Sequence, residues 1–151
     1  MDKEQLNQQI ALFYFGYRTF TETADLIIAK HQLKRLHHRI LFFTARMPGL
    51  TIHDLLMFLE ISKQALHKPL AELRERELIR IEEGQDDRRN RCLFLTAAGN
   101  RLERELGIAQ QKQMEQIFNE IGGDAAASFK QVMEAYAANR PGTSYIKDFK
   151  E

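Results

Sequence analysis

The sequence predicts a mainly α-helical fold that contains one small β-hairpin. Apolar residues recur at spacings of three and four along most of the chain, which is the period of amphipathic helices. Between residues 78 and 96 this pattern gives way to two short apolar stretches, separated by a polar loop, the first alternating and rich in β-branched residues. Such stretches predict two paired strands. The length of 151 residues fits one compact unit, or a dimer that shares long helices between subunits.

The first predicted element is an amphipathic helix of about 25 residues. Its apolar stripe is unusually aromatic, and one subunit of this size offers limited cover for so large an apolar surface. We therefore expect this helix to contribute to a dimer interface. The stripe consists of Leu6, Ile10, Phe13, Tyr17, Phe20, Ala24 and Ile27.

Three shorter segments lead to the hairpin. A helix through residues 36–44 should end at the proline–glycine pair at 48–49, because proline cannot continue a helix and glycine favours turns. Thr51, with Asp54 three residues later, predicts a capping box at the start of a short helix. Ser62 predicts the N-cap of the next helix. The buried stripe of that helix is expected to be Leu66, Leu70 and Leu73.

Two residues disturb the helix that follows Ser62. Pro69 lies about seven residues into it and deletes one backbone hydrogen bond, so we expect a bend there. Glu77 directly precedes the Leu-Ile pair that begins the first predicted strand, so any left-handed cap there would have to be borne by a residue with a side chain, at a cost of roughly 1 kcal/mol relative to glycine.

The hairpin and the C-terminal helices follow. Strands are expected over residues 78–83 and 91–96, and their connection, residues 84–90, is a charged tip longer than a two-residue turn. Thr96 can cap a long helix that the glycines at 122–123 end. A last helix precedes a tail that carries Tyr145, Ile146 and Phe149 and that either docks or frays.

The order helix, helix, strand, charged loop, strand is typical of a winged helix-turn-helix, whose second helix enters the DNA major groove. With the leucines turned inward, the outer face of that helix holds the candidate contacts, and its N-terminus favours a phosphate. Gln64 suits an adenine edge, and Lys63 and Lys68 suit guanine or phosphate. The alternative for the arginines of the loop is a solvated tip with internal ion pairs. The full set of candidates is Ser62, Lys63, Gln64, His67, Lys68, Arg88, Arg89 and Arg91.

The motifs LTIHDL, ISKQAL, LIRI, DDRRNR and LFLTAAG, in this order within residues 33–106, resemble the MarR (SlyA-type) family of transcriptional regulators. The resemblance implies a homodimer with interlocked N- and C-terminal helices. It also implies that Arg89 enters the minor groove while Asp87 supports the wing, and that a small aromatic ligand or cysteine oxidation regulates binding. Residues 1–151 would form one unit, with a DNA-binding part at 33–96 and dimerisation helices and a tail at 1–32 and 97–151.

Other polar residues have simpler interpretations. Cys92 is the single cysteine, which rules out an internal disulfide; we expect a small buried residue there, with a redox thiol as the alternative. The five histidines lack metal-ligand spacing and are expected at the surface or an interface. Alternatively, some line an effector pocket with tyrosines of the first helix, and the candidates for that pocket are Tyr14, Tyr17, His37 and His38.

Composition narrows the function further. The net charge of +1 means that any DNA contact must come from local clusters. We find no phosphate-binding glycine loop, nucleophile elbow or metal cluster, so we expect neither an enzyme nor a cofactor. The chain shows no export signal and no apolar run of about 18 residues, which predicts a cytoplasmic protein away from membranes. The leading hypothesis is a dimeric repressor on a pseudo-palindromic operator; the alternative is a winged-helix module for protein contacts only.

Overall fold

The structure is a computed structural model that describes residues 1–84 and 90–151. It is mainly helical with one antiparallel hairpin, which confirms the predicted fold class. The elements, in chain order, are α1 (Lys3–Ala29), α2 (Arg35–Arg46), α3 (Ile52–Leu59), α4 (Lys63–Glu75), β1 (Ile79–Glu83), β2 (Arg91–Leu95), α5 (Ala97–Ile121), α6 (Ala125–Ala137) and the 3-10 helix η1 (Thr143–Asp148).

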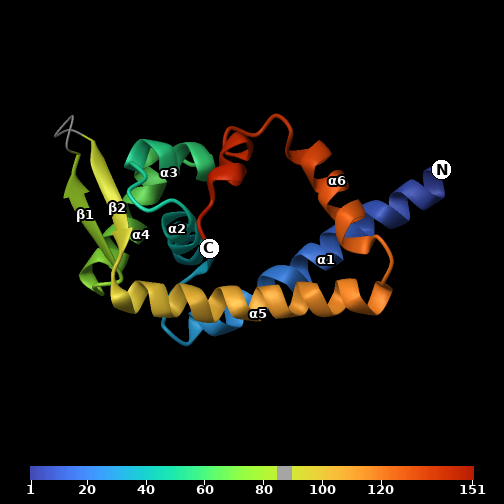
Figure 1. Ribbon diagram of the computed structural model, residues 1–151, viewed down its shortest axis with the longest axis horizontal. Helices are drawn as coiled ribbons and strands as arrows, with labels where there is room; N and C mark the ends of the chain where they lie inside the picture. The colour runs from blue at the N-terminus through green and yellow to red at the C-terminus, as the bar shows by residue number, and fades with distance from the viewer. Residues whose placement is uncertain (85–89) are drawn as a thin grey trace.

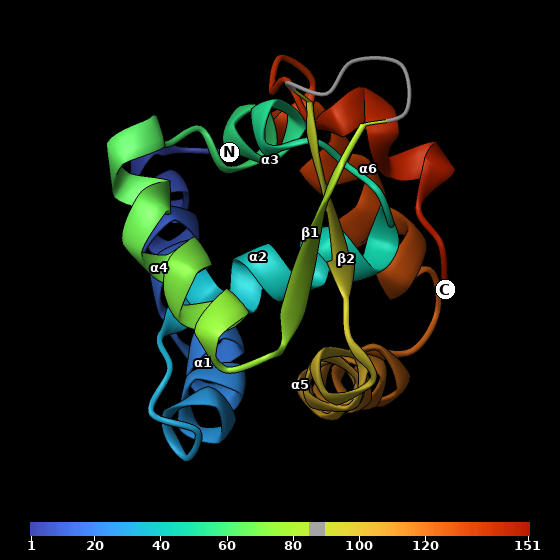
Figure 2. The same cartoon turned by 90° about the vertical axis from the view of Figure 1, so that its left-hand side faces the viewer.

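Helix α5 is the long axis of the molecule (Figure 1). The hairpin stands at its N-terminal end, and α6 folds back over its C-terminal end beside the N-terminal half of α1. Helices α2, α3 and α4 cluster next to the hairpin, and the view from that end places α4 and α5 on different sides of the two strands (Figure 2). The winged helix-turn-helix therefore occupies one end of an elongated molecule.

The predicted helix caps are confirmed. Thr51 Oγ1 accepts a hydrogen bond from the Asp54 N–H, and Asp54 Oδ2 accepts one from the Thr51 N–H, both at 3.0 Å. The hydroxyl oxygens of Ser62 and Thr96 each accept from the N–H three residues later, at 3.0 and 3.1 Å. These short-range bonds set the first residue of α3, α4 and α5.

Helix α4 continues through Pro69 to Glu75. Beyond it, Glu77 adopts a left-handed conformation with a φ of 56°, so a residue with a side chain does bear the cap. The Leu78 N–H then donates to the Leu73 carbonyl and the Glu77 N–H to the Arg74 carbonyl, each at 3.0 Å. This is the Schellman arrangement, and it turns the chain from α4 directly into β1.

The hairpin is attached to α5 at its base. Ile79 pairs with Leu95, and the Thr96 N–H donates to the Leu78 carbonyl at 3.1 Å. In the first turn of α5, a Cβ on Gly99 would lie only 1.9 Å from that carbonyl oxygen. The residue there is a glycine because the backbone of the hairpin base passes where a side chain would begin.

One apolar core joins the helix-turn-helix to the inner halves of α1 and α5, and all of residues 1–20 lie outside it, as does α6. Between α2 and α5, Arg46 Nη2 lies 3.0 Å from Glu103 Oε1, and both side chains are largely buried, at 15% and 7% exposure. The core residues are Ala24, Ile28, Leu33, Ile40, Leu41, Leu50, Leu55, Leu66, Leu70, Leu73, Ile79, Leu93, Leu102 and Leu106.

Candidate nucleic-acid interface

Helix α4 presents one polar face to solvent. Leu66, Leu70 and Leu73 are buried against α2 and the hairpin, as expected from their spacing. The side chains of all five candidate contacts at the N-terminal end of α4 are exposed together, and they are Ser62, Lys63, Gln64, His67 and Lys68. Since the apolar residues of this helix already have their place in the core, this polar face is free to bind a partner.

The start of α4 is suited to an anion. Ser62 Oγ accepts from the Ala65 N–H, which leaves the preceding N–H groups of the first turn directed outward. These groups carry the positive end of the helix dipole, and Lys63 adds a full charge beside them. A phosphate is therefore the ligand that this end of the helix favours.

The opposite end of α4 is held to the helices behind it. The Arg76 guanidinium donates to the backbone carbonyls of His31 and Gln32, just after α1. In the last part of α4, Glu72 Oε2 lies 3.6 Å from His37 Nε2 on α2. The roles of Glu72 and Arg76 were not predictable from the sequence, because their partners are distant in the chain. Their charges near the end of a helix were the only signal.

His37 and His38 are buried within the single chain, at 4% and 7% exposure, so the expectation that they lie at the surface or an interface is wrong. The reason is that α2 contacts α1, α3, α4, α5 and β2, which leaves it little exposed surface. His37 Nδ1 accepts from the Lys34 N–H at 2.8 Å, so the neutral ring carries its proton on Nε2, facing Glu72. Burial lowers the pKa of His37 and of His38 below the ordinary 6.5.

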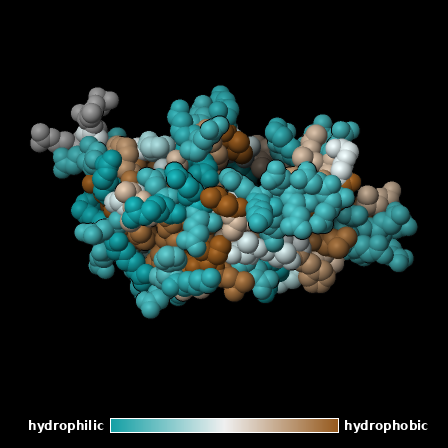
Figure 3. All heavy atoms as spheres, turned by 60° about the horizontal axis from the view of Figure 1, so that its bottom comes forward, coloured by the Kyte–Doolittle hydropathy of each residue, from teal (hydrophilic) through white to brown (hydrophobic). Residues whose placement is uncertain are grey.

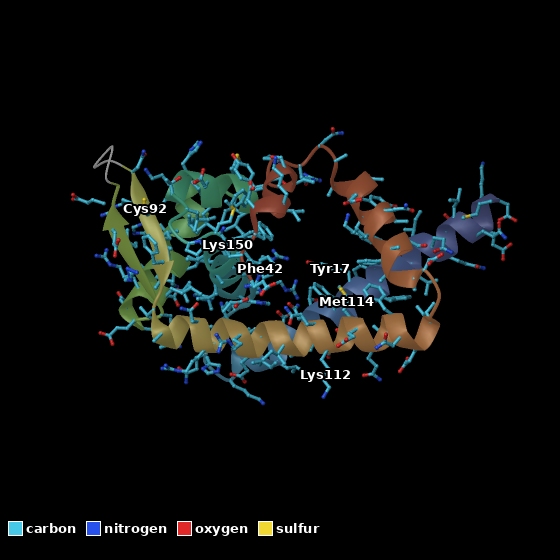
Figure 4. All side chains as sticks on the ribbon, viewed as in Figure 1. Tyr17, Phe42, Cys92, Lys112, Met114 and Lys150 are labelled. Carbon is cyan, nitrogen blue, oxygen red and sulfur yellow. The ribbon has the colours of Figure 1, made fainter. Side chains whose placement is uncertain are left out.

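The hairpin places a second basic element beside α4. Arg91 is exposed at the distal end of β2, opposite Glu83 of β1. On β1, the Arg80 guanidinium stacks 4.6 Å from the centre of the Phe94 ring and also pairs with Glu82. The candidates Asp87, Arg88 and Arg89 lie outside the described residues. Cys92 is half-buried in β2 and carries a free thiol (Figure 4).

Unlike His37 and His38, the candidate tyrosines of α1 are exposed. Tyr14 is 56% exposed. Tyr17 faces the space between α1 and α5, where Figure 4 shows it near Met114, and its hydroxyl accepts from Arg39 Nη2 at 2.9 Å. Of the four candidate pocket residues, only Tyr17 lines the large groove of the molecule.

That groove, about 860 Å³ in volume, is almost wholly apolar and lies between α1, α5 and α6. Figure 3 shows hydrophobic side chains at the surface on the α5 side of the molecule, among the hydrophilic ones. The groove is lined by Leu12, Phe13, Gly16, Tyr17, Thr19, Phe20, Gln113, Met114, Ile117, Phe118, Ile121, Ala125, Phe129 and Met133.

The described part of the chain holds neither a membrane-spanning helix nor a cluster of metal-ligating side chains. No helix within residues 1–84 and 90–151 is long and apolar enough to cross a membrane. Over the same residues, His, Cys, Asp and Glu side chains form no group of three or more that could hold a metal ion.

Comparison with known proteins places the chain among regulators. A family model described as the MarR family matches residues 31–90, which include the helix-turn-helix and the start of the hairpin. The HTH-type transcriptional regulator PetP of Rhodobacter capsulatus is 41% identical over 132 residues, covering 87% of this chain and 80% of that protein.

Solved structures share the fold. A MarR family transcription regulator matches with a TM-score of 0.77 at 17% identity, covering 89% of each chain. Staphylococcus aureus MarR, in complex with salicylate and kanamycin, matches with a TM-score of 0.74 at 22% identity, covering 91% of this chain and 95% of that chain. With the identity to PetP spanning most of both proteins, this chain belongs to the MarR family and is a DNA-binding, winged helix-turn-helix transcriptional regulator rather than an enzyme.

Proposed function

We propose that the chain is a homodimeric repressor that binds a pseudo-palindromic duplex. The observation that carries this proposal is the exposed polar face of α4, residues 62–68, on a helix whose leucines are fully committed to the core. Two such helices, one from each subunit, would enter successive major grooves about 34–36 Å apart. A transcriptional regulator acts on chromosomal DNA, so we propose that the protein is cytoplasmic.

The second copy of the chain would cover the apolar groove. Residues 3–20 of α1 are exposed along their whole length in a single chain, including Phe13 and Phe15, which are 52% and 61% exposed. On α6, Val132 and Tyr136 are 54% and 71% exposed. Contiguous apolar surface of this extent is typical of a stable dimer interface and not of a monomer.

Within this proposal, Gln64 reads base edges and Lys63, Lys68 and the N-terminus of α4 contact phosphates. His67 lies on the same face. Arg91 would contact the backbone beside the wing. By the family resemblance, Arg88 and Arg89 extend this contact, Arg89 into the minor groove, with Asp87 as its support.

Selection from random duplexes, followed by titration of the selected site, tests the proposal. Gln64→Ala should lose about 1–3 kcal/mol on the selected site and little on random DNA. Lys63→Ala should weaken both and reduce the salt slope by about one. Lys112→Ala is the matched control, because Lys112 is exposed on the outer side of α5 (Figure 4). No salt-sensitive binding of the wild-type dimer to any duplex would contradict the proposal.

We further propose that a small aromatic ligand releases the DNA. The Arg39 guanidinium at the Tyr17 hydroxyl offers a cation beside aromatic rings, which suits an aromatic carboxylate. The salicylate complex of the S. aureus protein supports this choice of ligand class. Salicylate, used as the probe, should lower the fraction of bound operator, and Arg39→Gln should require more of it. If salicylate releases operator from the Arg39→Gln variant as readily as from wild type, this arginine does not bind the ligand. If no aromatic acid releases the operator, the proposed regulation is refuted.

A further inference from the structure

The chain beyond α6 does not fray but returns to the helix-turn-helix (Figure 1). After a turn that Thr143 Oγ1 closes on the Ala137 carbonyl at 2.6 Å, η1 lies against α2 and α3. Helix α6, from which this segment departs, lies at the other end of the molecule and lines the apolar groove. We call residues 139–151 the strap.

Aromatic rings attach the strap. Phe149 packs against Phe42 and Phe43 of α2, with ring centres 6.2 Å apart in both pairs and the planes close to perpendicular. Tyr145 packs against Phe58 of α3 at 5.1 Å, in the same edge-on manner. Phe58 lies 5.3 Å from Phe43, so the five rings form one cluster. Such pairs add specific geometry to the burial of apolar surface.

Polar contacts hold both ends of the cluster. The Lys150 N–H donates to the Arg46 carbonyl at the end of α2, at 2.8 Å. Figure 4 shows Lys150 next to Phe42. At the start of the strap, Arg140 Nη1 lies 3.0 Å from Glu60 Oε1, in the turn between α3 and α4. The strap is thus anchored on both sides of α3.

The close contact between the strap and α3 explains why residue 142 is a glycine. Its φ of −80° is one that any residue adopts, so the backbone does not require a glycine. A Cβ at this position would lie 3.0 Å from Phe58 Cδ1, which is tighter than most Cβ contacts, so the Phe58 ring would have to shift by a few tenths of an ångström. The glycine permits the close approach of the strap to α3.

We propose that Gly142, Tyr145 and Phe149 are positioning residues for DNA recognition. They fix α3, and through its turn α4, relative to α6 of the same chain. Because α6 belongs to the surface that the proposed dimer buries, the strap sets the separation of the two recognition helices. This inference rests on the proposed homodimer. The separation that the strap sets would determine which half-site spacing the protein prefers.

The direct test measures the distance between α4 and α6 within one chain, by electron–electron double resonance. Spin labels are attached at Glu75→Cys and Lys130→Cys in a Cys92→Ser background, and labelled chain is diluted with unlabelled chain. Both positions are exposed. Phe149→Ala and Gly142→Val should broaden the distance distribution, and Tyr145→Phe, which keeps the ring, should not. Ile146→Ala is the matched control on η1, since Ile146 is 56% exposed.

The functional test compares the selected operator with one lengthened by two base pairs between its half-sites. Phe149→Ala should bind the selected operator roughly 2- to 30-fold more weakly and discriminate less between the two spacings, with random-DNA binding unchanged. An unchanged distance distribution together with an unchanged spacing preference would overturn the inference. Dissociation of the dimer by Phe149→Ala would overturn it too, because the strap would then belong to the interface. If wild-type protein selects no duplex, the proposed function fails, and the distance measurement still decides whether the strap positions α4.

Discussion

Replacing Gly99 by alanine tests the attachment of the hairpin to α5. Alanine ordinarily stabilises a helix by about 1 kcal/mol relative to glycine, so propensity alone predicts a more stable protein. The structure predicts the reverse. The new Cβ would meet the Leu78 carbonyl oxygen at 1.9 Å, whereas ordinary contact begins at 3.4 Å.

The magnitude follows from what must move. The first turn of α5 and the hairpin base have to separate, which breaks the 3.1 Å bond between the Thr96 N–H and the Leu78 carbonyl. Loss of that bond costs about 1 kcal/mol, and overpacking of a tight core contact costs about 2 kcal/mol. After the gain in helix propensity of about 1 kcal/mol, Gly99→Ala should destabilise the fold by about 2 kcal/mol.

Urea unfolding followed by circular dichroism measures this difference, and the thermal midpoint should fall by roughly 4–8 °C. Gly107→Ala on the same helix is the control. Its Cβ would lie 3.6 Å from Glu103 Oε1 and 3.7 Å from Arg46 Nη2, which is ordinary contact. That variant should be as stable as wild type or more stable. A Gly99→Ala protein that unfolds at or above the wild-type midpoint would refute the reasoning.

Three further predictions concern charge and backbone. Arg46→Ala leaves the Glu103 carboxylate buried without its cation and should cost about 3–5 kcal/mol in urea unfolding, while Arg46→Met combined with Glu103→Leu should recover most of it. Burial holds the pKa values of His37 and His38 below 6.5, so the unfolded chain binds protons first and stability should fall as the pH drops below about 6.5; equal urea midpoints at pH 7.5 and 5.5 would contradict this. Glu77→Gly should stabilise the fold by about 0.5–1 kcal/mol, because glycine adopts the φ of 56° without strain, and a lower midpoint would exclude that account.

Local chemistry made much of the fold predictable. The capping oxygens of Thr51, Ser62 and Thr96 act within three residues, so the sequence alone identified where three helices begin. The exposed face of α4 followed from the spacing of its leucines. Gly122, whose φ is 74°, ends α5 where its residue type predicted.

Features that depend on distant partners were not predictable. His37 and His38 are adjacent and both buried, because α2 is enclosed by neighbours from several parts of the chain, which periodicity on one helix does not reveal. The sequence did not distinguish a docked tail from a frayed one. The tail docks because the packing of α2 and α3 brings together Phe42, Phe43 and Phe58, which are separate in sequence. The same holds for Arg76, whose acceptors are backbone carbonyls more than forty residues away.

The attachment of the hairpin to α5 gives that helix the mechanics of a lever. Its first turn is fixed to the hairpin base through Thr96, and its last turns line the apolar groove. Its 25 residues span roughly 37 Å at 1.5 Å per residue. A tilt of about 5° imposed on the groove end would therefore displace the hairpin by roughly 3 Å, close to the rise of about 3.4 Å between successive base pairs. A small change of packing at the groove end of α5 is thus large enough to move the hairpin by a distance comparable to one base-pair step.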